Sequence, residues 1–381
     1  MESKADVKKI GLITFFKDNY GSILQCYATK RVVEELHYIC VVLSEKEERQ
    51  LKNENFIFRK IKYYKFIIEN LLRDPKFVTR WFCARKNPFP LSDESRAMMN
   101  AFVSSEICPE NYSINEIDDK EYYAFVSGSD QIWNVNNKIT EWYFLKFASD
   151  YKKIAFSVSL GTDNPSRKFK SIIKKGIKGY NRVSVREESA VQIIKSITGV
   201  NVERIADPII MLSADEWIEF SSAARVTVSN YILVHFLNCP SDIAVNYIEK
   251  MRGGCNVVCI AYRYQVFEKM GWDYVECDPR EYVAYITAAN SVFTDSFHTS
   301  LFSINIGKDF YVFERQYVHS HPQTSRISEM LKRYKLEDRL IGGMDEVVTT
   351  DVGMAQAVVH NERERAIAFL SDSLRSIVER S

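Results

Sequence analysis

The sequence predicts an α/β protein with two domains, each built on a parallel β-sheet. At 381 residues the chain is too long for one ordinary core, and it suits two domains of roughly 150–200 residues each. Strand-like apolar runs alternate with amphipathic helical segments, which is the pattern of consecutive βα units. Several strands end in polar turns, and in such a sheet these turns line the ligand-binding crevice. We expect a first domain at residues 1–207, a second at 208–350 and a final helix within 351–381.

The first domain opens with a strand, a helix and a second strand. The apolar run 9–16 precedes a polar turn and an amphipathic helix, and the run 39–43 forms the next strand. Within the turn, Asn19, Gly21 and Ser22 would bring an amide, backbone N–H groups and a hydroxyl to the carboxyl edge of the sheet. The alternative interpretation is an ordinary helix N-terminus.

Three further strands are expected in this domain, at 124–126, 154–158 and 182–185. The first runs into the polar cluster 128–134, and the last delivers Arg186 at its end. Four strands of one sheet therefore end in polar groups, as a crevice lined by βα-loops requires.

The second domain repeats this plan. Its strands are expected at 231–237, 256–262, 291–293 and 310–313, and two of its helices at 243–251 and 279–289. The stretch 294–304 opens a short helix, so Ser296 and His298 lie at a strand-to-helix turn. The alternative is that Asp295 or Ser296 only caps this helix and that His298 is a structural histidine. The last segment of the chain has one apolar helical face, and we expect it to pack back across the first domain.

A basic helical insertion is expected at about residues 46–95. Residues 46–89 contain twelve Lys and Arg against five Asp and Glu, interleaved with aromatic side chains. One interpretation is a solvated helical face. The other is an approach surface for a lipid-linked acceptor, with peripheral contact to the inner face of the membrane.

The composition excludes several functional classes. The chain has 51 basic and 50 acidic residues, a balance that argues against nucleic-acid binding. No apolar run approaches the ~20 residues needed to span a bilayer, and the N-terminus lacks the apolar stretch of a signal peptide, so a cytoplasmic location is expected. The eight cysteines show no paired spacing and are read as reduced core residues. No metal site is expected, because His319 and His321 lack a third ligand at useful spacing.

Six short motifs occur in order along the chain. They are NYGSILQCYA at 19–28, GSDQIWN at 128–134, SVRE at 184–187, ADP at 206–208, TDSFH at 294–298 and SRISEML at 325–331. Together they resemble the polysaccharide pyruvyl transferase family over nearly the whole chain. The resemblance implies a glycosyltransferase-B-like architecture, with two Rossmann-like domains facing each other across a cleft. It also implies transfer of pyruvate from phosphoenolpyruvate to two hydroxyls of a glycan sugar, forming a cyclic ketal in bacterial capsule or exopolysaccharide synthesis. No cofactor is implied beyond phosphoenolpyruvate as co-substrate.

This chemistry assigns expected roles to the motif residues. Phosphoenolpyruvate is an enol phosphate, so its methylene carbon must be protonated before a hydroxyl attacks C2, and His298 is the expected acid. Asp130 is either the base for the acceptor hydroxyl or the residue that holds the Gly128 turn. Gln131 and Trp133, in the same motif, are expected to contact the acceptor.

The donor carries a carboxylate and a phosphate, which cations and N–H groups bind. Arg186 matches the family arginine assigned to the donor, and Asn19, Gly21, Ser22 and Ser296 are expected to surround it.

One position departs from the family pattern. Family members often carry Arg-Leu-His where this chain has Ser296-Phe297-His298. Another cation is expected to replace the missing arginine, and Arg263, Arg315 and Arg326 are the nearest candidates. Arg326 is equally compatible with a capping or interdomain role.

Two alternatives remain open. A sugar-nucleotide glycosyltransferase of the same architecture would need a nucleotide site in the second domain. A non-catalytic family member retained in a glycan-assembly complex would explain the missing arginine.

Overall fold

The computed structural model of the chain describes residues 8–46, 91–134, 141–260, 270–315 and 324–377. Most of the basic insertion expected at 46–95 lies outside these residues, as do Arg263, His319 and His321. The membrane-facing surface and the donor role of Arg263 therefore stay predictions.

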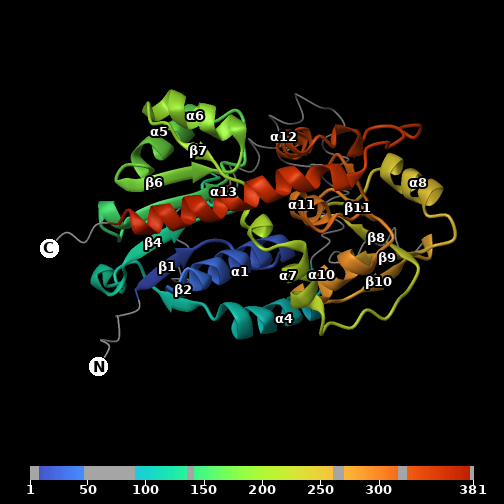
Figure 1. Cartoon of the computed structure of the whole chain (residues 1–381), viewed down its shortest axis with the longest axis horizontal. Helices are drawn as coiled ribbons and strands as arrows, with labels where there is room; N and C mark the ends of the chain where they lie inside the picture. Colours follow the sequence, from blue (N-terminus) through green and yellow to red (C-terminus); the bar gives the residue numbers. More distant parts are fainter. Residues whose placement is uncertain (1–7, 47–90, 135–140, 261–269, 316–323, 378–381) are drawn as a thin grey trace, which may run out of the picture.

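The described residues form two separate parallel sheets, which confirms the predicted α/β class (Figure 1). The first sheet has the strand order β3-β2-β1-β4-β5-β6-β7. Its strands are β1 Lys9–Ile13, β2 Ile39–Glu45, β3 Glu110–Tyr112, β4 Ala124–Ser127, β5 Lys153–Val158, β6 Tyr180–Val185 and β7 Glu203–Arg204. The second sheet has the order β10-β9-β8-β11-β12-β13. Its strands are β8 Tyr231–His235, β9 Asn256–Ile260, β10 Asp273–Val275, β11 Val292–Thr294, β12 Phe310–Phe313 and β13 Leu340–Ile341.

Helices connect the strands of both sheets. Those of the first domain are α1 Tyr20–Glu35, α4 Asp93–Phe102, α5 Arg167–Gly176 and α6 Glu188–Thr198. Those that follow are α7 Ala214–Ser221, α8 Asp242–Met251, α10 Pro279–Ala288, α11 Phe297–Ile306, α12 Thr324–Tyr334 and α13 Gln356–Arg375. The sequence did not predict the short strands β3, β7, β10 and β13, which lie toward the edges of the two sheets.

Helix α1 of the first domain contacts the second domain at its N-terminal end. Its N-cap is Asn19, whose side-chain oxygen accepts a hydrogen bond from the Ser22 backbone N–H at 3.1 Å. The first helical residue, Tyr20, stacks on Tyr282 of α10 with ring centroids 4.4 Å apart, and its hydroxyl donates to the carbonyl oxygen of Cys277 at 2.7 Å. The start of α1 is therefore fixed by the second domain.

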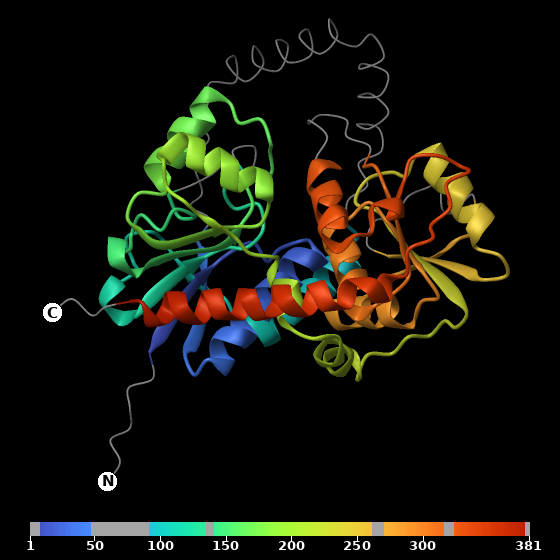
Figure 2. The ribbon, with the colours of Figure 1, turned by 45° about the horizontal axis from the view of Figure 1, so that its top comes forward.

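Helix α13 extends past both sheets (Figure 2). Phe369 of this helix stacks against Phe156 of β5, and Arg363 donates from Nε to the carbonyl oxygen of Ile210 at 2.8 Å. The last helix thus contacts the first sheet although it follows the second one in the chain.

None of the described helices has both the length and the apolar character of a membrane-spanning segment.

Candidate active site

Turns from both domains meet around one pocket of about 220 Å³, here called the central pocket. Its lining includes Phe15, Asn19, Ser22, Asp130, Gln131, Arg186, Leu237, Ser296, Phe297, His298, Arg315 and Arg326. The first-domain members follow β1, β4 and β6, and the second-domain members follow β8, β11 and β12 or belong to α12. The carboxyl ends of two parallel sheets therefore face the same space.

His298 is the second residue of α11 and rests against the first domain. Ser296 caps the helix, and its Oγ accepts from the Thr299 backbone N–H at 3.4 Å. A Cβ atom added to Gly21 would lie 2.2 Å from Nδ1 of His298 and 2.5 Å from its Cβ, far inside normal contact. Only glycine at position 21 lets α1 approach the histidine this closely.

The other ring nitrogen of His298 faces a buried ionic cluster. Nε2 lies 3.3 Å from Oδ2 of Asp207 and 3.5 Å from Nη1 of Arg186, which is itself 2.7 Å from the same Asp207 oxygen. Asp207 also accepts from the Ile209 backbone N–H through Oδ1 at 3.1 Å. Burial alone would raise the pKa of Asp207, but the charge and hydrogen bond of His298 and the charge of Arg186 outweigh burial and lower this pKa to about 2. Asp207 therefore carries a negative charge that orients both partners.

Arg186 is the most completely enclosed cation of the site. Only 5% of the residue is exposed, its guanidinium lies 4.4 Å from the ring centroid of Phe297, and Nε lies 3.2 Å from Oε1 of Glu187. Its Nη2 is buried and has no hydrogen-bond partner among the described residues. A buried N–H group without a partner is costly, so this atom is suited to an anionic ligand.

Asp130 joins the two turns of the first domain. Its Oδ2 accepts from Ser22 Oγ at 2.5 Å, and its Oδ1 accepts from the Gln131 backbone N–H at 2.7 Å. It thus holds its own turn while its side chain also lines the central pocket. Both roles considered for Asp130 are compatible with this position.

Two of the three arginines nominated to replace the missing one line the central pocket. Arg315 is anchored by Asp295, with Nε 3.3 Å from Oδ2 and Nη2 donating to the backbone carbonyl oxygen at 2.8 Å. With the Gln131 amide oxygen turned toward it, Arg326 donates to Gln131 from Nη1 at 2.8 Å and from Nη2 at 2.9 Å. Arg326 of α12 therefore links the two domains as well as lining the pocket.

Trp133 does not occupy the place expected for it. The side chain is fully buried, its Nε1 donates to the Tyr143 carbonyl oxygen at 3.2 Å, and its ring stacks on Phe144. It belongs to the core of the first domain and is absent from the lining of the central pocket. The expected acceptor contact of Trp133 is corrected accordingly, whereas Gln131 does line the pocket.

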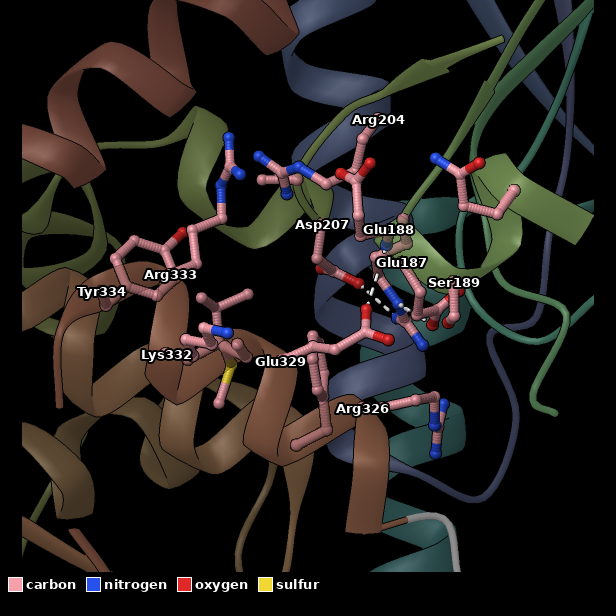
Figure 3. A pocket seen from close by; sticks show the side chains of 16 residues that line it. Glu187, Glu188, Ser189, Arg204, Asp207, Arg326, Glu329, Lys332, Arg333 and Tyr334 are labelled. Atoms are coloured by element: carbon pink, nitrogen blue, oxygen red, sulfur yellow. Dashed lines mark hydrogen bonds and ion pairs between the residues drawn. The ribbon is translucent and has the colours of Figure 1, made fainter. Parts of the chain in front are cut away.

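A larger cavity of about 590 Å³, here called the cleft pocket, adjoins the central pocket and shares Arg186, Phe297 and Arg326 with it. Figure 3 shows Arg326, Glu329 and Arg333 of α12 on one side and residues of the first domain, such as Arg204, on the other. Arg204 and Arg333 both pair with Glu362 of α13. This cavity was not anticipated from the sequence.

The functional residue that sequence reasoning missed is Asp207. Its motif was noted, but no role was assigned to it. The available signal was a carboxylate in a short motif directly before Pro208, which stops regular secondary structure. Among the described residues, no group of three or more His, Cys, Asp or Glu could hold a metal ion.

Comparison with known proteins agrees with this architecture. One solved structure with a similar fold is UDP-GlcNAc 2-epimerase from Neisseria meningitidis bound to UDP-GlcNAc. The two share 9% sequence identity and a TM-score of 0.50, and the match covers 96% of this chain and 99% of the epimerase chain. Another is S. aureus MnaA in a co-structure with UDP. It shares 10% sequence identity and a TM-score of 0.50, and the match covers 98% of this chain and 93% of the MnaA chain. At this identity they show the fold alone, which is of the glycosyltransferase-B type.

None of the curated proteins matches the sequence. A sequence model described as polysaccharide pyruvyl transferase matches residues 19–317, which span both domains and every residue lining the central pocket except Phe15 and Arg326. The chain therefore belongs to the polysaccharide pyruvyl transferase family.

Proposed function

We propose that the protein transfers pyruvate from phosphoenolpyruvate to two hydroxyls of a glycan sugar, forming a cyclic ketal in capsule or exopolysaccharide synthesis. The observation that carries the proposal is the grouping of Arg186, Arg315, Arg326 and His298 around one pocket of about 220 Å³. A ligand with two anionic groups a few ångströms apart and an enol carbon that accepts a proton matches that set of side chains.

In this proposal the arginines bind the donor. Arg186 offers its buried Nη2 to a donor oxygen, and Arg315 supplies the cation that the family usually places at position 296. Arg326 completes the cationic wall from α12. Asn19 and Ser296 shape the remaining wall as helix caps.

His298 acts as the general acid. Asp207 accepts a hydrogen bond from Nε2–H and so orients the imidazole ring, and in this proposal the protonated ring gives a proton to the methylene carbon of the donor. A sugar hydroxyl attacks C2, a second hydroxyl follows, and the bond from C2 to the phosphate oxygen breaks. One hydroxyl proton replaces the proton given by His298, and the other leaves on the phosphate. Asp130 is the proposed base for the attacking hydroxyl.

Incubation with phosphoenolpyruvate and galactose-, glucose- and mannose-containing acceptors tests the proposal. Mass spectrometry should detect a pyruvylidene adduct, and phosphate should appear only when acceptor is present. His298→Gln should lose roughly 10²–10⁴-fold in turnover while donor binding persists. Arg186→Ala should remove the rise in melting temperature that phosphoenolpyruvate causes, and Arg31→Ala, an exposed arginine on α1, should leave both readouts unchanged.

Two outcomes would reject this function. Transfer of a sugar from UDP-galactose or UDP-glucose without use of phosphoenolpyruvate would favour a sugar-nucleotide glycosyltransferase. Absence of both phosphoenolpyruvate binding and turnover in the folded protein would favour the non-catalytic alternative.

We also propose that the acceptor is a lipid-linked oligosaccharide. The basic and aromatic composition of residues 46–89 motivates this proposal.

A further inference from the structure

A third cavity, here called the side pocket, opens next to the central pocket. It encloses about 370 Å³ and is lined by first-domain residues that follow or end β1 and β2, together with Trp142 and Tyr143. Small-ligand sites typically run from about 300 to 1,000 Å³, so the side pocket has room for a ligand of monosaccharide size. The described functions of the central pocket do not use it.

The side pocket and the cleft pocket flank the central pocket with different chemistry. The side pocket shares Phe15 and Ser22 with the central pocket, and Ser22 Oγ donates to Asp130 at 2.5 Å. The cleft pocket instead shares the cations Arg186 and Arg326. The side pocket therefore borders Ser22, the hydrogen-bond partner of the proposed base Asp130, and the cleft pocket borders the proposed anion-binding groups.

The reaction distinguishes these two sides. The attacking hydroxyls must lose protons, so the acceptor needs to arrive where a carboxylate is within reach. The departing phosphate is an anion, so it leaves most readily along cations. Resting on the function proposed above, we infer that the side pocket binds the acceptor as one neutral pyranose residue, with its reacting hydroxyls directed past Ser22 toward Asp130.

The walls of the side pocket suit a neutral sugar. Phe15 and Tyr143 form an edge-to-face pair with ring centroids 5.1 Å apart, which offers aromatic surface to the apolar face of a pyranose. Burial raises the pKa of Tyr143 to about 12, so its hydroxyl stays neutral and can donate to a sugar oxygen. Glu45 and Lys17 contribute one charge of each sign, which gives no net preference for an anionic sugar.

Saturation-transfer NMR without phosphoenolpyruvate tests the side pocket independently of the reaction. It should monitor the binding of methyl galactoside, methyl glucoside and methyl mannoside. At least one glycoside should bind the wild type, and Tyr143→Ala should weaken that binding at least tenfold. Tyr143→Phe keeps the ring and the packing, so it should retain most of the binding. Glu45→Gln, at an exposed position, should reduce binding without a folding defect. Gln192→Ala in the cleft pocket serves as the matched control and should bind as the wild type does.

Kinetics then separate the two proposals. If the enzyme is active, Tyr143→Ala should raise the acceptor KM at least tenfold while phosphoenolpyruvate binding stays unchanged. Active enzyme with an unchanged acceptor KM in Tyr143→Ala and Glu45→Gln overturns the side-pocket assignment, and so does a raised acceptor KM in Gln192→Ala alone. Glycoside binding that depends on Tyr143 in a protein without ketal formation would leave the sugar site standing and reject the pyruvyl transfer.

Discussion

Replacement of Gly21 by alanine tests how tightly the two domains must close over His298. The new methyl group would lie 2.2 Å from Nδ1, 2.3 Å from Cγ and 2.5 Å from Cβ of the histidine. Because Cβ does not move when the side chain rotates, no other rotamer of His298 removes the overlap. Helices α1 and α11 must separate by about 0.9 Å before Cβ reaches the 3.4 Å at which ordinary contact begins.

The size of this movement sets the expected effect. A displacement of about 1 Å between reacting groups lowers an enzymatic rate by roughly 10²-fold, which corresponds to about 3 kcal/mol of activation free energy. Separation also weakens the Tyr20–Tyr282 stack, worth about 0.5–1.5 kcal/mol. Alanine is better than glycine inside a helix by up to about 1 kcal/mol, which offsets much of that loss in stability. We therefore expect a strong effect on kcat and a small effect on the free energy of unfolding.

The assay compares Gly21→Ala with Gly254→Ala. Gly254 is exposed, and a Cβ atom there meets nothing within 4 Å, so its variant should behave as the wild type. Turnover of phosphoenolpyruvate and urea unfolding should be measured for both proteins. Wild-type kcat in Gly21→Ala would refute the reasoning, and so would an equal loss of activity in both variants.

Three further predictions concern charge, pH and packing. Asp207→Asn should lower turnover by about 10²–10⁴-fold and remove about 2 kcal/mol of stability at pH 7. Because the pKa of Asp207 is lowered to about 2 in the folded protein, the wild type should lose this contribution as pH falls from about 4 through about 2. Equal urea midpoints for wild type and variant at pH 7 would contradict this prediction. Burial lowers the pKa of His235 to about 4, so the unfolded chain binds more protons between pH 6.5 and 4, and the wild type should lose about 3 kcal/mol of stability as pH falls through that window. His235→Gln should flatten that part of the stability profile, and an unchanged slope would assign the loss to other groups. Phe369→Ala should cost about 3–5 kcal/mol in urea unfolding, whereas the exposed Glu364→Ala on the same helix should stay within about 0.5 kcal/mol; similar values for the two would show that α13 is not packed on the first sheet.

The sequence predicted the strands whose hydrophobic runs are continuous. β12 was predicted with its observed bounds, and β1, β5 and β8 were each found within a few residues, because strands buried on both faces read as apolar runs. The short strands β7 and β13 have two residues each, too few for any periodic pattern. Their pairing depends on the neighbouring strand and not on their own composition.

The sequence predicted which turns contribute to the site but not which residues of the two domains contact each other. Polar residues after parallel strands must gather at one edge, so the turns of Ser22, Asp130, Arg186 and His298 were identified from position alone. The contact of Gly21 with His298 joins two domains and leaves no local pattern in the sequence. Trp133 was misjudged because an aromatic residue within a polar motif has the same sequence appearance whether its ring faces the core or the cleft.

The serine at position 296 has a structural consequence for the proposed donor site. Ser296 accepts a hydrogen bond from Thr299 as the N-cap of α11, which an arginine side chain cannot do because it has no acceptor. Arg315 is held instead by Asp295, whose carboxylate is fixed in turn by the backbone N–H groups of Leu237 and Asn238 at 2.7 and 3.2 Å. A cation anchored through two successive contacts loses less side-chain freedom on binding an anion than one that extends freely from a helix start. The exchange of arginine for serine therefore keeps the helix cap and moves the proposed donor cation to the next strand.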